Sequence, residues 1–127
     1  MNRTIMPASI AAPVANYAHA VLVEGVGRTL YTSGVVPASP DGSVPDGIGA
    51  QAEVVWSNIV AILDEAGLAL ADIVSITTYV VVGHPLAEVM AARDRALAGH
   101  LAASTLVPVP ALARPEWLLE IAVVASR

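Results

Sequence analysis

The sequence predicts an α+β domain in which two helices pack on one face of a single mixed sheet. Two stretches carry apolar residues at helical spacing, and several short runs are rich in β-branched residues. Glycine and proline clusters separate these segments. The predicted order is β-β-α-β-α-β-β, and 127 residues suit one domain, spanning residues 1–127, with a genuine core.

The first third of the chain is predicted to form strands followed by a loop. Residues 18–24 and 28–34 are β-prone runs separated by Gly25, Val26 and Gly27, which predicts a β-hairpin with a glycine-assisted turn. A further short strand is expected around residues 3–6. The stretch 37–49 is rich in proline, glycine and aspartate, and therefore predicts a loop.

The rest of the chain alternates between helix and strand. A helix is predicted over residues 50–66, with its apolar face formed by Val55, Ile59, Ile62, Leu63 and Ala66 and with Gly67 suited to its C-terminal cap. Residues 72–82 predict a central strand, and Pro85 suits the first turn of a second helix that continues to about residue 100. Strands over 104–109 and 117–125 complete the predicted sheet.

Charge and composition exclude several classes of function. The net charge is −5 and the six cationic side chains are all arginines without a basic cluster, which argues against binding nucleic acid through phosphate neutralisation. The chain has no cysteine, so disulfides, thiolate metal sites and a thiol nucleophile are excluded. The three histidines are scattered without metal-ligand spacing, and we therefore expect no metal and no cofactor.

The chain is unusually apolar for a small domain. Hydrophobic residues make up 56% of it and charged residues 13%, yet no apolar run reaches the length of about 18 residues that a membrane-spanning helix needs. The beginning of the chain also lacks the long apolar stretch of a signal peptide, so we expect a cytoplasmic protein without membrane contact. We expect the excess apolar surface to lie in an oligomer interface, because one face of the predicted sheet has no covering helices.

A single carboxylate, Glu120, interrupts the apolar run of residues 117–125. A run of this kind is typical of a strand buried on both faces or of a short core helix. An unpaired buried carboxylate is costly, and such groups are often functional. The alternative is that Glu120 lies at the rim of the domain and pairs with an arginine.

Several segments, in this order, resemble the Rid family, the YjgF-type reactive-intermediate deaminases formerly labelled endoribonuclease L-PSP. No single segment is specific, but the ordered set covers nearly the whole chain. The matching segments are 17–21 (YAHAV), 31–34 (YTSG), 36–37 (VP), Gln51, the helix ending at Gly67, 70–74 (LADIV), 77–78 (TT), 103–105 (AST) and 120–121 (EI). The resemblance implies a chorismate-mutase-like fold, a homotrimer, and clefts between subunits that bind a small molecule.

The resemblance also implies an activity and a set of site residues. Characterised members hydrolyse 2-imino and 2-enamino acids to 2-oxo acids and ammonia. Glu120 matches the glutamate that positions or activates the attacking water, a general acid–base role. Tyr17 and Ser33 match cleft-lining residues, and Thr105 matches a position that is often cysteine. Without the resemblance, Tyr17 would be interpreted as a packing residue and Ser33 as a hydrogen-bonding residue at a strand end.

One position departs from the family pattern. The arginine that binds the substrate carboxylate precedes the serine of the penultimate strand, and here that position is Ala103. We therefore expect an imine or enamine substrate different from the standard 2-imino acids, with Arg114 as the candidate replacement and a surface role as its alternative. The alternatives at the level of function are a non-catalytic trimer that binds a small molecule, and an endoribonuclease, which the acidic charge disfavours.

Overall fold

The computed structural model describes residues 1–25 and 27–127, and its elements alternate much as the sequence predicts. The elements are β1 (Asn2–Ile5), β2 (Ala20–Val23), β3 (Thr29–Tyr31), α1 (Ile48–Glu65), the short 3-10 helix η1 (Leu70–Asp72), β4 (Ile73–Val81), α2 (Leu86–Leu97), β5 (Ala103–Val109) and β6 (Leu119–Ser126). The predicted helices and later strands are confirmed to within a few residues at each end.

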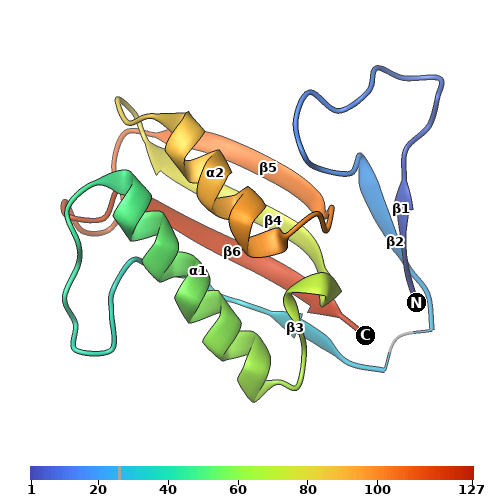
Figure 1. Ribbon diagram of the computed structural model, residues 1–127, viewed down its shortest axis with the longest axis horizontal. Coiled ribbons are helices and arrows are strands. Elements are labelled where there is room, and N and C mark those ends of the chain that lie inside the picture. The colour runs from blue at the N-terminus through green and yellow to red at the C-terminus, as the bar shows by residue number, and fades with distance from the viewer. Residues whose placement is uncertain (26) are drawn as a thin grey trace.

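Four strands form a mixed sheet in the order β3-β6-β4-β5. Strand β4 runs parallel to β5 and antiparallel to β6, and β6 runs antiparallel to β3. The parallel pair needs a crossover connection, which α2 provides. Both helices cover one face of this sheet, as Figure 1 shows, and the predicted α+β arrangement is confirmed.

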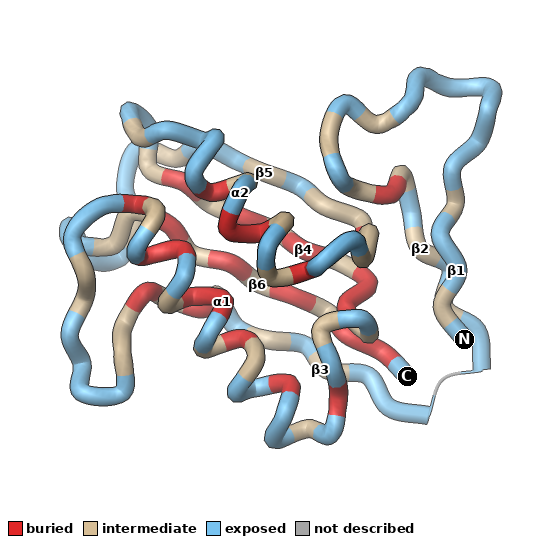
Figure 2. The backbone as a smooth tube through the Cα atoms, in the orientation of Figure 1, coloured by how far each residue is buried: buried red, intermediate tan, exposed pale blue. Residues whose placement is uncertain are grey.

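The core lies between the two helices and the sheet. The buried positions in Figure 2 follow the inner faces of α1, α2, β4 and β6. Ile59 and Leu63 of α1 and Ile76 and Ile121 of the sheet are at most 1% exposed. Each such side chain contributes about 1.5–3 kcal/mol on burial, so this layer is a main source of the stability of the domain.

The predicted hairpin between residues 18–24 and 28–34 is wrong. Strand β2 pairs instead with β1, with Asn2 opposite Val23 and Ile5 opposite Ala20. Strand β3 pairs with β6. Figure 1 shows the β1–β2 ribbon standing apart from the four-stranded sheet. The predicted turn includes Val26, which lies outside the described residues.

A physical reason for the different pairing is visible just before β2. The backbone N–H of Ala18 donates to the carbonyl of Ala102 at 2.9 Å, which fixes the segment that leads into β2 beside the start of β5. Strand β5 is at the opposite edge of the sheet from β3. The β-propensity of residues 20–23 therefore predicts a strand correctly, but it does not specify which strand is its partner.

The face of the sheet opposite the helices carries several polar side chains. Residues paired across neighbouring strands point to the same face, and Tyr79 of β4 pairs with Glu120 of β6. Thr77 pairs with Ala122 on one side and with Thr105 on the other. The residues of β4 and β6 on this open face are half-buried, whereas their neighbours in sequence are buried against the helices.

Candidate functional site

Glu120 is the second residue of β6 and lies on the open face of the sheet. Neither the core-helix interpretation of its apolar run nor burial on both faces is correct, because residues of β6 alternate between buried and half-buried. Among the described residues, no ion pair or side-chain hydrogen bond involves the Glu120 carboxylate. The carboxylate is therefore available to a ligand or a water molecule.

Gly34 makes room for that carboxylate. A Cβ atom built at Gly34 would overlap the Oε2 and Cδ atoms of Glu120. The two segments are held together next to this contact, because the N–H of Val35 donates to the carbonyl of Ile121 at 2.7 Å and the N–H of Ile121 donates back at 3.1 Å. The glycine is therefore required for space, and the contact fixes Glu120 beside residues 33–35.

Ser33 lies next to this contact and is exposed. It borders a surface hollow of about 460 Å³ whose other lining residues come mainly from the segment after β3 and from α1. The structure thus brings two of the predicted site residues, Ser33 and Glu120, to either side of Gly34. We call Ser33, Gly34 and Glu120 the glutamate group.

Two amide side chains of α1 hold the loops on both sides of the glutamate group. Asn58 donates from Nδ2 to the carbonyl oxygens of Val36 at 3.2 Å and Ala38 at 2.9 Å. These carbonyls lie just beyond Gly34 in the chain, so Asn58 fixes the segment that carries Ser33 and Gly34. The residue also lines the 460 Å³ hollow.

Gln51, seven residues earlier on the same helix, holds the loop that leads into β6. Its Nε2 donates to the carbonyls of Pro45 at 3.0 Å and Glu116 at 2.9 Å, and its Oε1 accepts from the N–H of Leu118 at 2.9 Å. The side chain is 2% exposed, and its hydrogen-bonding capacity is almost fully used. Gln51 therefore positions the entry to the strand that carries Glu120.

Tyr17 lies away from the glutamate group. Its neighbour Ala18 forms a bridge with Ala103 at the start of β5, and Asn16 donates from Nδ2 to Asp94 of α2 at 3.1 Å. These contacts on both sides hold Tyr17 beside Ala103, the position where the family resemblance places an arginine. Tyr17 itself is half-buried.

Thr105 and Ala103 share the open face with Glu120 but lie on the far strand. Ala103 pairs with Ser75, and Glu120 pairs with Tyr79, four residues further along β4. Ala103 is therefore offset from Glu120 by two strand spacings across the sheet and four residues along the strands, a distance of about 16 Å. For Thr105, which is offset by two residues along the strands, the distance is about 12 Å. We call Tyr17, Ala103 and Thr105 the tyrosine group; within one chain it does not meet the glutamate group.

Arg114 lies in the loop before β6 and contacts its own neighbours. Its guanidinium stands over the Trp117 ring, 5.6 Å from the centroid, and Nη1 is 4.0 Å from the Glu116 carboxylate. The side chain is 66% exposed. Arg93 of α2 is buried instead, with Nη2 3.1 Å from Asp94. Among the described residues, neither arginine forms an ion pair with Glu120, and the role of Arg114 as a replacement stays a prediction.

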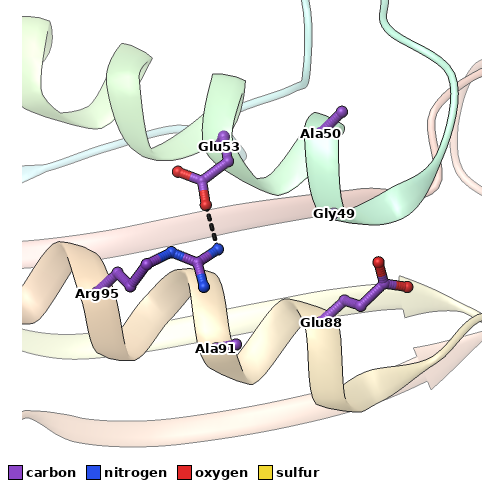
Figure 3. A pocket seen from close by; sticks show the side chains of 6 residues that line it. All are labelled: Gly49, Ala50, Glu53, Glu88, Ala91 and Arg95. Carbon is purple, nitrogen blue, oxygen red and sulfur yellow. Dashed lines mark hydrogen bonds and ion pairs between the residues drawn. The ribbon is translucent and has the colours of Figure 1, made fainter.

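A separate groove lies between the two helices. Figure 3 shows it bordered by Glu53 and Gly49 of α1 and by Glu88 and Arg95 of α2, with an ion pair between Arg95 and Glu53. Its volume is about 340 Å³. It lies on the helix side of the molecule, whereas Glu120 faces the opposite side of the sheet, so this groove and the candidate site are unrelated.

Sequence reasoning missed three contributors to the site. The pattern of residues gives no sign that Gly34 receives the Glu120 carboxylate, because that contact joins segments 86 residues apart. The alternation in β4 does place Tyr79 on one face with Thr77, but only the register with β6 shows that it lies opposite Glu120. The hydrogen bonds of Gln51 likewise depend on the tertiary fold.

Two negative findings concern the described part of the chain. Its histidine and acidic residues form no cluster of three or more that could hold a metal ion. Its helices include none with the length and apolar character needed to span a membrane.

Comparisons with known proteins agree on one family. The family model described as Endoribonuclease L-PSP matches residues 8–127. The 2-iminobutanoate/2-iminopropanoate deaminase of Escherichia coli (strain K12) is 36% identical over 81 residues, which are 63% of this chain and 61% of that protein. A RutC family protein of Pasteurella multocida is 38% identical over 81 residues, covering 63% of this chain and 60% of its own. The matched part thus spans about three fifths of these curated relatives.

Solved structures cover nearly the whole chain. The protein YyfB of Yersinia pestis, a Rid protein of unknown function, matches with a TM-score of 0.90 and 35% identity, covering 99% of this chain and 98% of its own. The YjgF gene product of E. coli matches with a TM-score of 0.73 and 30% identity, covering 98% of both chains. RidA of an Antarctic Psychrobacter gives a TM-score of 0.75 at 30% identity, covering 98% and 99%.

Proposed function

This chain belongs to the Rid family, the family described as Endoribonuclease L-PSP, and we propose that it is a hydrolytic deaminase of a reactive imine or enamine. The observation that carries the proposal is the Glu120 carboxylate, which lies over Gly34 on the open face of the sheet and has no ion-pair partner among residues 1–25 and 27–127. The name of the E. coli relative, an iminobutanoate/iminopropanoate deaminase, supports the same chemistry.

The proposed reaction balances with water alone. As the water oxygen bonds to the imine carbon, Glu120 accepts one proton from the water and the C=N π electrons move to the nitrogen. Glu120 passes this proton to the nitrogen, which gives a neutral carbinolamine. The hydroxyl proton then moves through Glu120 to the nitrogen while the C–N bond breaks with its electron pair on the nitrogen, so that a carbonyl product and ammonia leave and Glu120 is again a carboxylate. A carboxylate held within hydrogen-bond reach of the water is the group this step needs.

We further propose that the substrate is not a standard 2-imino acid. Such a substrate carries a carboxylate, which a bidentate arginine would bind, and Ala103 occupies that position. Losing such a pair should cost roughly 2–5 kcal/mol of carboxylate binding. The substrate class is therefore an imine or enamine whose recognition does not depend on this contact, or one whose carboxylate Arg114 binds.

The proposed assembly is a homotrimer with ligand clefts between subunits. Its support is the separation of the two groups of site residues by about 12–16 Å within one chain, since a cleft built from both needs two copies. The open face of the sheet, opposite the face that α1 and α2 cover, is the surface proposed to meet another copy.

Ribonuclease activity has less support from this surface. Four of the six arginines, at positions 93, 95, 114 and 127, already pair with acidic side chains. The net charge is −5, so few cations remain for a phosphate backbone. We propose that purified protein cleaves no RNA; cleavage that persists in the pure oligomer would revive this activity.

Ammonia release from freshly generated imines tests the proposed function. The panel should contain 2-iminopropanoate, 2-iminobutanoate, and imines of amines that lack the carboxylate, with Glu120→Gln as the matched variant. We expect turnover of at least one imine by the wild type and a loss of about 10²–10⁴-fold in Glu120→Gln. Saturable binding of these imines without ammonia release would favour the non-catalytic alternative, and an unchanged rate in Glu120→Gln would reject the role of this residue.

A further inference from the structure

We propose that the β1–β2 ribbon of one copy completes the sheet of a second copy, with β2 pairing antiparallel along the free edge of β3. The occupant of that edge is thus a second copy of this chain. The exchange of strands stands on the fold alone, whereas the chemistry of the joined site rests on the proposed function.

Strands β2 and β3 each have one edge without a ladder among the described residues. Strand β2 is paired with β1, and β3 is paired with β6. An open strand edge is a template for pairing with another chain. A two-stranded ribbon is at best marginally stable by itself, so the ribbon in Figure 1 gains stability from a third strand.

The sequence shows that these two strands suit each other. The residues around β2 and β3 predict a hairpin, and only residues 24–28 separate the two strands. In the structure the ribbon lies near β5 instead, at the opposite edge of the sheet. An element that suits a neighbouring strand but is fixed elsewhere in its own chain can pair with the same strand of another copy, as in domain swapping.

An apolar groove lies between Leu30 of β3 and the C-terminal part of α1. It has a volume of about 430 Å³ and is lined by Leu30, Ala61, Ile62, Glu65 and Ala66. Leu30 pairs with the fully buried Ala125 and so points to the helix side. In the register that pairs Leu22 with Leu30, Leu22 also points to that side. Leu22 is 40% exposed and Ile62 is 36% exposed, and the pairing would cover both.

Charge complements this apolar match. Arg3 pairs with Leu22 within the ribbon, so both point to the same face. Glu65 is the charged residue of the groove. A ribbon docked with Leu22 over the groove therefore brings the guanidinium of Arg3 toward the carboxylate of Glu65, and this pairing favours the ribbon as occupant over an apolar segment without charge.

The exchange also joins the two groups of site residues. In an antiparallel pair, residues that precede β2 run beside residues that follow β3. Tyr17 precedes β2 by three residues, and Ser33 and Gly34 follow β3 by two and three. Because Tyr17 is held beside Ala103 of its own chain, docking places the tyrosine group of one copy against the glutamate group of the next.

Cysteine cross-linking tests the exchange directly, because the natural chain has no cysteine. The double variant Leu22→Cys/Leu30→Cys is oxidised mildly and resolved on a denaturing, non-reducing gel. The second double variant, Val21→Cys/Tyr31→Cys, repeats the test at the neighbouring pair. Tyr31 is 75% exposed, so its replacement should not unfold the protein, and the test can still be made if the first variant fails to fold. A short bis-maleimide cross-linker can still join the two cysteines if the register of the strand pair is shifted by two residues. We expect covalently linked dimers and larger species.

Two controls define the result. Refolding a mixture of the single variants Leu22→Cys and Leu30→Cys should give a heterodimer that neither gives alone. Val14→Cys/Leu30→Cys, with a residue that is 93% exposed in the loop before β2, should remain monomeric on the gel.

Two outcomes would overturn the proposal. A monomeric band without free thiols would mean that β2 folds back onto β3 of its own chain. A monomeric band with reactive thiols would mean that the two strands do not pair. Neither outcome depends on substrate, and a cross-linked oligomer that releases no ammonia would retain the exchange while rejecting the proposed function.

Discussion

Gly34 and Glu120 depend on each other through space rather than through backbone conformation. Gly34 is not among the residues with positive φ, so its backbone would accept an alanine. What it lacks is room, because the Glu120 carboxylate occupies the position of its Cβ. At the scale of single residues, the site therefore consists of a catalytic candidate and a glycine that determines where its side chain lies.

Gly34→Ala should reduce deaminase activity without directly changing any polar group. The new methyl group displaces the Glu120 carboxylate, so the expected loss of kcat approaches that of Glu120→Gln, about 10²–10⁴-fold. Steady-state ammonia release on the substrate found in the imine panel measures it. Activity equal to the wild type would show that the position of Glu120 over Gly34 is unimportant.

Gly49→Ala is the matched control. Its new methyl group meets the Oε1 atom of Glu88, also a carboxylate oxygen, but in the groove between the helices that Figure 3 shows. We expect full activity in this variant. A double-mutant cycle adds a second test. The Gly34→Ala substitution should lower the free energy of unfolding more in the wild-type background than in the Glu120→Ala background, because the overlapping carboxylate is absent from the latter.

The ion pair between Arg95 and Glu53 should contribute little to stability. Both side chains are more than half exposed, at 62% and 55%, so solvent screens their attraction. We expect Glu53→Gln to change the free energy of unfolding by less than about 1 kcal/mol in urea denaturation. A larger loss would mean that this groove contributes to the fold in a way the contacts do not show.

At the scale of elements, α1 organises the site from the other side of the sheet. Its apolar face forms the core, while Gln51 and Asn58 bind the two loops that flank the glutamate group. The helix therefore both forms the core and positions the two loops. The second role depends on polar side chains, which the hydrophobic periodicity of the helix does not identify.

Gln51→Leu should destabilise the protein strongly. The variant leaves the N–H of Leu118 and the carbonyls of Pro45 and Glu116 without their partner, so the expected loss is about 2–4 kcal/mol in the free energy of unfolding. Urea denaturation measures this loss, with Ser57→Ala, an exposed position on the same helix, as the control. A loss as small as that of the control would contradict the role of Gln51.

The sequence predicts elements better than it predicts their partners. The helical spacing of Val55, Ile59 and Leu63 is a local signal, and the helix forms where it is predicted. The pairing of β2 depends on the contact between Ala18 and Ala102, 84 residues away, which no local pattern contains. Glu120 could likewise be selected because the apolar run around it is a local pattern. The close approach of its carboxylate to Gly34 could not be predicted, because it joins segments far apart in the sequence.

At the scale of the whole molecule, one chain carries the two groups of site residues at separate places on its open sheet face. The resemblance to the Rid family selects Tyr17, Ser33, Thr105 and Glu120 together, because it compares positions in a sequence. The fold separates them: Tyr17 lies beside Ala103, whereas Ser33 precedes Gly34, the residue that contacts Glu120. We therefore propose that a working site of this composition is built from at least two copies.

Ala103→Arg tests most directly the claim that this is a Rid deaminase scaffold with a changed substrate. Ammonia release from 2-iminobutanoate should be compared between wild type, Ala103→Arg and Ala103→Arg/Glu120→Gln. We predict little turnover by the wild type, a gain of at least about tenfold in kcat/KM with the arginine, equivalent to about 1.4 kcal/mol, and loss of that gain in the double variant. Efficient hydrolysis by the wild type, or no gain from the arginine in a folded protein, would contradict the claim.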